Sequence, residues 1–153
     1  MHFDDLNAGN CADAAKLLGW SVALATPAVE GENARVTKRL ASEKGALVLF
    51  HESFGRGNRE LLAVAKEREH VFEFPIRPLL HAPPQSRPKL MAAYRSFLSA
   101  CVKRRIPFVF TSRGQDALDV KTPREVIAIA QFLGLTRQQA AASITETPKR
   151  FLE

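Results

Sequence analysis

The sequence predicts one α/β domain of repeated βα units, with about five parallel strands and a helical cap at its C-terminal end. Short β-rich runs alternate with capped amphipathic helices, without a low-complexity segment or a long linker. The run ALVLF at residues 46–50 is apolar throughout, as in a parallel strand buried on both faces. A length of 153 residues and a hydrophobic content of 46% suit one well-packed core rather than two. We therefore treat residues 1–153 as a single domain.

Five β-rich runs carry the strand prediction. The strands are expected at residues 2–6, 21–25, 46–50, 71–76 and 106–111. The fourth run, VFEFPI, contains Pro75, which cannot donate a ladder hydrogen bond and is expected at an edge, a bulge or the strand's end. The same run holds Glu73, whose carboxylate is costly to bury without a partner. Arg77 could reach it only if the chain bends, so the partner of Glu73 stays open.

Start and stop signals place helices between the strands. Asn10 is expected to cap the first helix, which Gly19 ends, and Asn58 to open the third. The second helix is expected over about residues 33–44 and the fourth over about residues 87–103, each with an apolar stripe.

The C-terminal part has start signals of its own. Thr122-Pro123-Arg124-Glu125 is a capping box with proline at the first helical position, and Gly134 closes the helix that it opens. Residues 136–139 repeat the box in its glutamine form, and Thr147-Pro148 opens a last turn. These signals predict the compact helical cap.

The charge balance favours a polyanionic partner. Lys and Arg number 22 against 16 Asp and Glu, which gives a net charge of +6 and a sequence pI near 9.7. Nucleic acid is the commonest such partner, although many small basic proteins bind none. Cys11 and Cys101 lie far apart with no Cys/His cluster near them, which argues against zinc and against a disulfide framework. No apolar run approaches the roughly 18 residues of a membrane span, and the first residues are acidic, so a cytoplasmic location is expected.

The motifs of common catalytic sites are missing from the sequence. No dinucleotide or phosphate loop follows a strand, Gly55-Arg56-Gly57 is too short a match to count, and neither Ser53 nor Ser112 stands in a Gly-x-Ser-x-Gly setting. A metal-dependent phosphoesterase stays open as an alternative, although its candidate ligands fit no spaced motif. Those ligands are His2, Asp4, Asp5, His51 and Glu52.

Basic residues stand in loops and helix starts, mostly near strand ends. They can bind phosphates, and Ser112 and Gln115 can add hydrogen bonds. Lys121 and Arg124 flank a helix start, where free amides also favour an anion. No aromatic residue alternates with these charges, so the backbone of folded RNA fits better than a single strand. For each lone arginine, the alternative is a solvated surface position. The basic candidates are Arg56, Arg59, Arg77, Arg87, Lys89, Lys103, Arg104, Arg105, Arg113, Lys121 and Arg124.

Several segments of the second half resemble one protein family. The segments are FEFPIRPLL, VFTSRGQDALDVKTPREVIAIAQFLGL and AAASITETPKRFL. Their order and spacing resemble the C-terminal half of the barrel-type protein subunit of archaeal and eukaryotic ribonuclease P, called component three in archaea. The family's hydrophobic-Arg-Pro-Leu-Leu element stands at residues 76–80, and its Asp-Val-basic-x-Pro-Arg-acidic helix start at 119–125. The match covers about residues 71–152, and HFDDLN near the start is similar to the family's opening strand.

This resemblance implies a TIM-barrel-like fold. Because about five strands are expected and eight close a regular barrel, the chain is expected to form an abridged barrel, with an open sheet or edges completed by another subunit as the alternatives. It implies a protein subunit of ribonuclease P, the enzyme that removes the 5′ leader from precursor tRNA. In that enzyme an RNA subunit with bound Mg²⁺ performs the hydrolysis, and this protein, paired with a small α/β subunit, stabilises the catalytic RNA. The isolated chain is then expected to be non-catalytic and to bind no cofactor itself.

The resemblance also implies which residues contact RNA. The phosphate contacts are Arg77, Arg87, Lys103, Arg113, Lys121 and Arg124, with hydrogen bonds from Gln115 and Ser112. The loop 113–121 then presents basic and polar groups to RNA or to the partner subunit. A structural alternative stays open, in which Asp116 and Asp119 pair with Arg113 and Lys121 and only order the loop. A non-catalytic protein-interaction module, whose basic face is incidental, is a further alternative.

Overall fold

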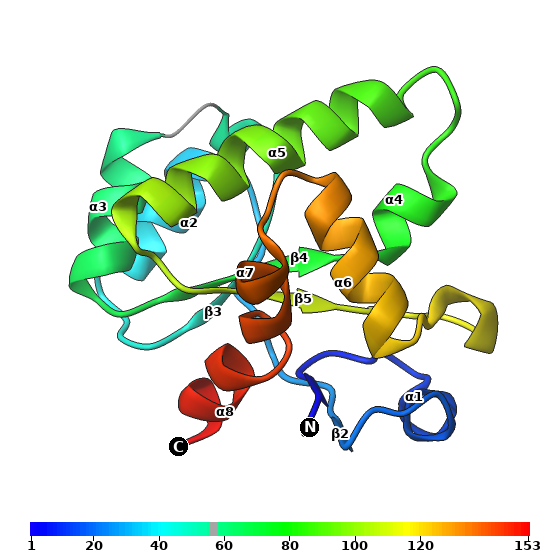
Figure 1. The fold of residues 1–153 in the computed structure, drawn as a ribbon. Helices are drawn as coiled ribbons and strands as arrows, with labels where there is room; N and C mark the ends of the chain where they lie inside the picture. Colours follow the sequence, from blue (N-terminus) through cyan, green and yellow to red (C-terminus); the bar gives the residue numbers. More distant parts are fainter. Residues whose placement is uncertain (56–57) are drawn as a thin grey trace.

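Within the part of the chain that the structure describes, five strands follow one another in the predicted order, with helices between them (Figure 1). This computed structural model describes residues 1–55 and 58–153, so the basic candidate Arg56 and the Gly-Arg-Gly match lie outside the described residues. Each predicted strand is present in shorter form, and all the strand pairs are parallel. The strands are β1 (Asp4–Asp5), β2 (Val22–Ala23), β3 (Leu47–Leu49), β4 (Val71–Pro75) and β5 (Phe108–Thr111).

The helices confirm most of the predicted start signals. The side chain of Asn58 accepts a hydrogen bond from the Leu61 amide, and Thr122 and Thr136 each form the predicted capping box. Pro75 is the last residue of its strand, one of the three places expected for it. The helices are α1 (Ala12–Leu17), α2 (Asn33–Leu40), η1 (Glu52–Phe54), α3 (Arg59–Glu67), α4 (Arg77–His81), α5 (Arg87–Arg104), η2 (Ala117–Asp119), α6 (Pro123–Phe132), α7 (Arg137–Ala142) and α8 (Glu146–Leu152).

Two predicted boundaries in the first half are wrong. The N-cap of α1 is Cys11, which makes no side-chain cap bond, whereas the Asn10 amide donates to the Gly114 carbonyl at 3.1 Å. Asn10 therefore pairs with a distant part of the chain rather than with its own helix. Helix α2 ends at Leu40, because residues 41–44 form a turn closed by backbone bonds to Arg39 and Leu40.

Two further differences lie in the second half. Residues 77–81, for which no helix was expected, form α4, and a proline in its first turn suits a helix start because that amide has no helical partner. Helix α8 begins at Glu146 with Thr145 as its N-cap, slightly ahead of the predicted Thr147-Pro148 start.

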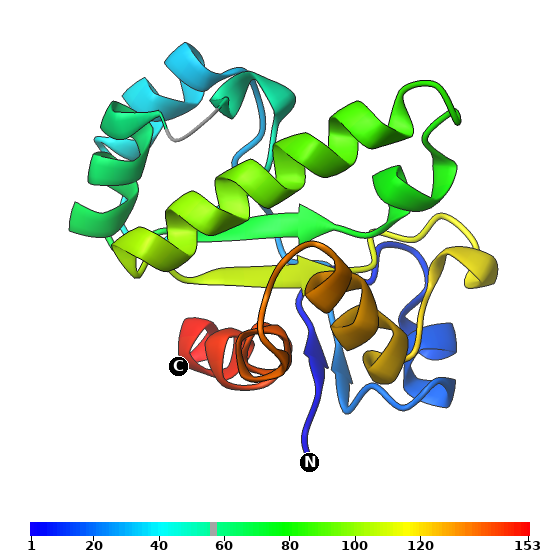
Figure 2. The same cartoon turned by 45° about the horizontal axis from the view of Figure 1, so that its top comes forward.

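Isolated bridges join the two sheets into a closed path, which we call the ring. The strands form one sheet of β1 and β2 and another in the order β3-β4-β5. After β2, Val29 pairs with Val48 of β3, and after β5, Gly114 pairs with Gly9, which follows β1. The path thus runs from β1 through β2 to β3, β4, β5 and back to the chain after β1. In Figure 2, β1 and β2 lie below β4 and β5 and run in a different direction.

Side chains on the strands alternate between the inside of the ring and the side covered by helices. Helix α5 crosses over β4 and β5 (Figures 1 and 2), and an aromatic cluster fills the space beneath it. Its members are Phe50, Phe72, Phe74, Tyr94, Phe97 and Phe110. A separate small apolar cluster consists of Leu6, Leu47, Val71 and Val109, with Phe151 of α8 packed against it. The strand positions that follow Val71 and Val109 on that side, Glu73 and Thr111, are polar and buried.

Within residues 1–55 and 58–153, no helix is both long and apolar enough to cross a membrane.

Candidate functional site

The carboxyl ends of the strands open onto a hollow of about 330 Å³, which we call the strand-end hollow. Folds of parallel βα units bind their ligands at this end of the strands. Its lining includes Asn7, Gly9, Arg77, Arg113, Gly114 and Gln115. The structure therefore brings together three of the predicted RNA contacts, Arg77, Arg113 and Gln115, in one place.

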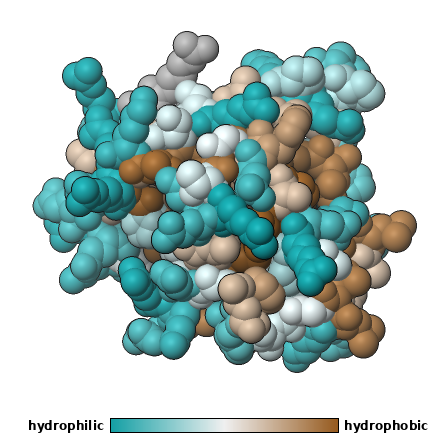
Figure 3. Space-filling view, in the orientation of Figure 1, coloured by the Kyte–Doolittle hydropathy of each residue, from teal (hydrophilic) through white to brown (hydrophobic). Residues whose placement is uncertain are grey.

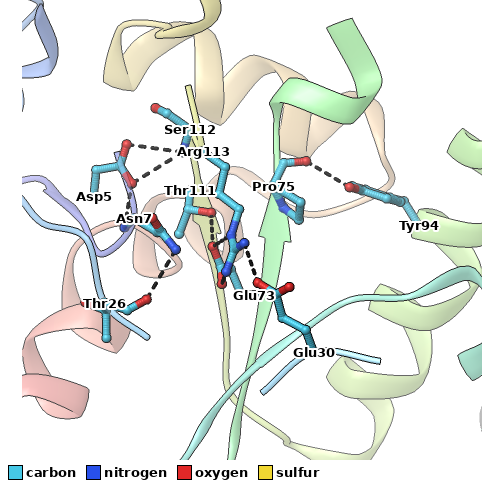
Figure 4. A network of polar contacts seen from close by, with 10 residues as sticks. All are labelled: Asp5, Asn7, Thr26, Glu30, Glu73, Pro75, Tyr94, Thr111, Ser112 and Arg113. Atoms are coloured by element: carbon cyan, nitrogen blue, oxygen red, sulfur yellow. Dashed lines mark hydrogen bonds and ion pairs between the residues drawn. The ribbon is translucent and has the colours of Figure 1, made fainter. Parts of the chain in front are cut away.

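Arg113 is the partner of Glu73 at the floor of this site (Figure 4). Its Nε and Nη2 donate to the two carboxylate oxygens at 2.8 and 3.0 Å, and Thr111 Oγ1 donates to Oε1 at 2.6 Å. Its Nη1 donates to Glu30 Oε1 at 2.7 Å. Glu73 is fully buried, and these three bonds satisfy a carboxylate that would otherwise be costly to hold there. One predicted phosphate contact is thus engaged by two carboxylates of the chain itself.

Asp5 ties β1 to the end of β5. Its carboxylate is fully buried and accepts hydrogen bonds from the backbone amides of Asn7 and Ser112 (Figure 4). Burial raises the pKa of Asp5 to about 6, against the lowering effect of those bonds. Ser112 is itself 2% exposed, so its hydroxyl is not available to an RNA molecule on the surface. The expectation that Ser112 adds hydrogen bonds to RNA is therefore wrong.

Asp119 holds the rim of the strand-end hollow in place. It accepts hydrogen bonds from Arg77 Nε at 3.0 Å, from the Gln115 amide at 2.8 Å, and from His81 Nε2. The bond from His81, together with those from Gln115 and Asp116 amides and Arg77, holds the pKa of Asp119 well below its usual range. Arg77 Nη2 also donates to Gln115 Oε1 at 2.9 Å. The buried Asp119 thus pairs with Arg77 and His81, not with Lys121 as the structural alternative proposed.

The loop 113–121 is ordered by bonds at several points along its length. Asp116 caps η2 by accepting from the Leu118 amide, and Lys121 Nζ donates to the Leu118 carbonyl at 3.1 Å. Trp20 Nε1 donates to the Lys121 carbonyl at 2.9 Å. Leu118, between these bonds, is 83% exposed. The loop therefore presents an apolar side chain to solvent from a fixed backbone.

The remaining predicted contacts lie outside the strand-end hollow. Arg87 begins α5 and donates to the Ala82 carbonyl at 3.0 Å, and Lys103 is exposed near the other end of that helix. Arg124 is exposed in the first turn of α6. The structure thus separates the predicted RNA contacts into a paired group in the hollow and a dispersed exposed group.

The candidate metal ligands are not brought together. His2 Nε2 lies 2.9 Å from Asp4 Oδ1 at the start of the chain, whereas His51 bonds to Ser53 beside η1. In residues 1–55 and 58–153 there is no group of three or more His, Cys, Asp or Glu side chains arranged to hold a metal ion.

Sequence reasoning missed Glu30 and Asn7 as parts of the site. Glu30 is placed by the Val29–Val48 bridge, and Asn7, whose carbonyl accepts from the Arg113 amide at 2.7 Å, by the pairing of β1 with the end of β5. Both placements depend on contacts between distant segments, so no local pattern marks either residue.

Comparison with known proteins places the chain in a family. A model of the family described as RNase P subunit p30 matches residues 27–153. Ribonuclease P protein component 3 of Methanosarcina barkeri is 28% identical over 127 residues, covering 81% of this chain and 53% of that protein. The protein of the same name from Thermococcus kodakarensis is 27% identical over 125 residues, covering 79% and 56%. The chain thus spans about half the length of the curated relatives it matches.

A solved structure shares the fold. A chain in a cryo-EM structure of archaeal Ribonuclease P with mature tRNA superposes with a TM-score of 0.65 at 19% identity, covering 76% of this chain and 50% of that one. The fold is an abridged barrel of parallel βα units whose strand-end site is occupied by its own ion pairs. The chain belongs to the RNase P subunit p30 family. The resemblance drawn from residues 71–152 is confirmed, and the match extends back to residue 27.

Proposed function

We propose that the chain is a protein subunit of ribonuclease P that binds and stabilises the catalytic RNA during removal of the 5′ leader from precursor tRNA. Family membership and the names of the relatives support this assignment. In this proposal the RNA subunit performs the hydrolysis with Mg²⁺ that it binds itself. The chain contributes no catalytic group and no cofactor site of its own.

The observation that carries the proposal is the internal pairing of the strand-end site. Enzymes of parallel βα units place their catalytic side chains at this end of the strands. Here Arg113 is bound by Glu73 and Glu30, and Arg77 by Asp119. These ion pairs therefore hold the loops around the strand-end hollow in a fixed arrangement. Such an arrangement suits a protein that supports RNA better than it suits a hydrolase.

The proposed partners are the catalytic RNA and a small α/β protein subunit, with precursor tRNA met indirectly. The predicted RNA contacts remain Arg77, Arg87, Lys103, Arg113, Gln115, Lys121 and Arg124. The ordered loop 113–121, with its exposed Leu118, is a candidate contact for RNA or for the protein partner. The proposed location is the cytoplasm.

Reconstitution tests the proposal directly. Precursor-tRNA cleavage by the cognate ribonuclease P RNA is measured at limiting Mg²⁺, with the RNA alone, with each protein alone, and with both proteins. We expect cleavage to appear only when the chain and its α/β partner are both added. Equal cleavage by RNA alone, with no binding of the chain to that RNA, would contradict the proposal. Phosphodiester hydrolysis by the chain and a metal ion without RNA would support the phosphoesterase alternative instead.

A further inference from the structure

Most of the net charge of the chain lies on helices outside the strand-end hollow. Residues 95–107 and 132–153 together hold seven Lys and Arg and two Glu, a net charge of +5, whereas the whole chain has +6. By contrast, residues 112–125 hold three cations and three carboxylates, so the loop at the hollow is neutral. We call the seven cations of the first two segments the basic helical face. They are Arg95, Lys103, Arg104, Arg105, Arg137, Lys149 and Arg150.

The cations of the basic helical face are free to meet a ligand. All seven side chains are exposed, and within the part of the chain that the structure describes none of them forms an ion pair. Arg95 is also held in position, because its guanidinium lies 5.1 Å from the centre of the Phe132 ring and donates to the Phe132 carbonyl at 2.8 Å. This differs from Arg77 and Arg113, whose charges are neutralised by buried carboxylates.

Two hollows lie on this face. One lies between α5 and the α6–α7 segment and is lined by Arg95, Lys103 and Gln139. The other lies at the amino ends of β4 and β5 and is lined by Arg105 and Arg150, with the carboxylate of Glu69, the ion-pair partner of Lys44, also on its wall. Arg95 and Lys103 line the same hollow, and their spacing of eight residues on one helix puts them about 12 Å apart along its axis. Figure 3 shows hydrophilic side chains over α7, α8 and the C-terminal end of α5.

Arg105 has the left-handed backbone conformation that is usually taken by glycine at the end of a helix. It follows α5 with φ of 55°, in the left-handed region, and Glu69 and Gly134 stand at the corresponding points after α3 and α6, with φ of 58° and 101°. Glycine is preferred there because other residues are strained. Arg105 makes no ion pair within the described residues, so the fold does not explain the choice of arginine. Binding of a negatively charged ligand to the guanidinium explains it.

We propose that the basic helical face binds the phosphate backbone of an RNA helix. Its cations are spread over the surfaces of three helices, and its exposed aromatic ring, Phe132, already has Arg95 over it, so the face offers charge rather than a row of aromatic rings for unpaired bases. The inference rests on the proposed function for its choice of RNA over an acidic protein. Lys103 is the one residue of the resemblance-implied set that belongs to this face.

A binding measurement tests the inference. A labelled RNA duplex of about 16 base pairs is titrated with the full chain, and its fluorescence anisotropy is recorded over a series of KCl concentrations. The test variant is Lys103→Gln/Arg105→Gly/Arg150→Gln. The control variant, Arg35→Gln/Lys38→Gln/Lys66→Gln, removes three exposed cations of α2 and α3 and has the same net charge. We expect the test variant to bind about tenfold more weakly or worse, with a salt slope smaller by about 1 for each phosphate that the protein no longer neutralises. The control should stay within about threefold of wild type.

The single variant Arg105→Gly separates binding from folding. It removes a cation and also relieves a left-handed conformation, so we expect weaker duplex binding in a protein with an unchanged or higher midpoint of thermal unfolding. Glu69→Gly is its match, since it relieves the same conformation while removing a negative charge, and it should bind the duplex at least as well as wild type.

Three results would overturn the inference. They are unchanged binding by the test variant, equal weakening by test and control variants, and displacement of the duplex by polyglutamate as readily as by unlabelled duplex. The proposed function has its own readout, the reconstituted cleavage assay. Loss of duplex binding in the test variant supports the inference even if that assay shows no need for the chain, and retained binding overturns it even if cleavage requires the chain.

Discussion

The guanidinium of Arg113 binds both carboxylate oxygens of Glu73, at 2.8 and 3.0 Å, and so joins the chain after β5 to the inside of β4. Glu73 is fully buried, and the Arg113 side chain is 24% exposed. The pair lies at the end of the strands where related folds place catalytic groups. In this chain the two residues instead contribute to the stability of the domain.

Replacing Glu73 with alanine should lower the free energy of unfolding by about 3–5 kcal/mol, because it leaves Arg113 partly buried with only Glu30 as a partner. Urea unfolding monitored by circular dichroism measures the change. The double variant Glu73→Met/Arg113→Met is the control, and it should recover a large part of the loss. A single variant as stable as wild type would show that the pair is dispensable.

Asp119→Asn should destabilise the protein by about 2–3 kcal/mol, because bonds to a charged acceptor are lost. The pKa of Asp119 is lower in the folded than in the unfolded chain, so its stabilising effect is present above the unfolded pKa near 3.9 and is lost as the pH falls below it. The free energy of unfolding, measured between about pH 5 and pH 2, should fall less steeply in the variant. Parallel curves for the two proteins would contradict this role.

Asp5 should show the opposite pH dependence. Its folded pKa of about 6 lies above the unfolded value, so the folded state holds an extra proton between about pH 4 and pH 6 and loses stability as the pH rises through that window. Asp5→Asn keeps an acceptor for the backbone amides and removes the charge. Its unfolding free energy should vary less with pH there and should equal or exceed that of wild type at pH 7. A variant with the wild-type slope would show that another group titrates.

Gly9→Ala should open the ring. An added Cβ would stand 2.2 Å from the Gly114 carbonyl oxygen, and the φ of 66° is already unfavourable for alanine. We expect a loss of about 2–5 kcal/mol in the free energy of unfolding. Gly45→Ala is the matched control, because its φ of 64° is similar and nothing lies within 4 Å of the added Cβ, so it isolates the backbone term. Equal losses in the two variants would mean that the close approach of Gly9 to Gly114 adds nothing.

Lys121→Ala/Arg124→Ala should reduce cleavage in the reconstituted enzyme at limiting Mg²⁺ and lessen its dependence on salt, if the loop meets RNA as the resemblance implies. Circular dichroism of the isolated variant checks the fold. Unchanged cleavage and an unchanged salt slope would leave the loop with a purely structural role.

The local signals of the sequence predicted the elements well. Three helices are capped by a side chain that accepts a hydrogen bond from the residue three positions on, namely Asn58, Thr122 and Thr136. Because both partners lie close together in the sequence, these caps could be predicted from it. The partner of Glu73 could not be predicted from the sequence, because Arg113 lies 40 residues away and only the register of β4 and β5 brings the two together. Arg113 and Lys103 look alike in the sequence, yet one is neutralised inside the fold and the other is exposed.

The bond between Asp5 and the Ser112 amide joins residues 107 positions apart, at the point where the ring closes. At synthesis rates of about 5–20 residues per second, the opening segment waits roughly 5–20 s on the ribosome for that partner to be made. Contacts of such long range also slow spontaneous folding. The ring therefore closes late in the folding of each newly made chain. Until it closes, Asp5 is an ordinary carboxylate exposed to water.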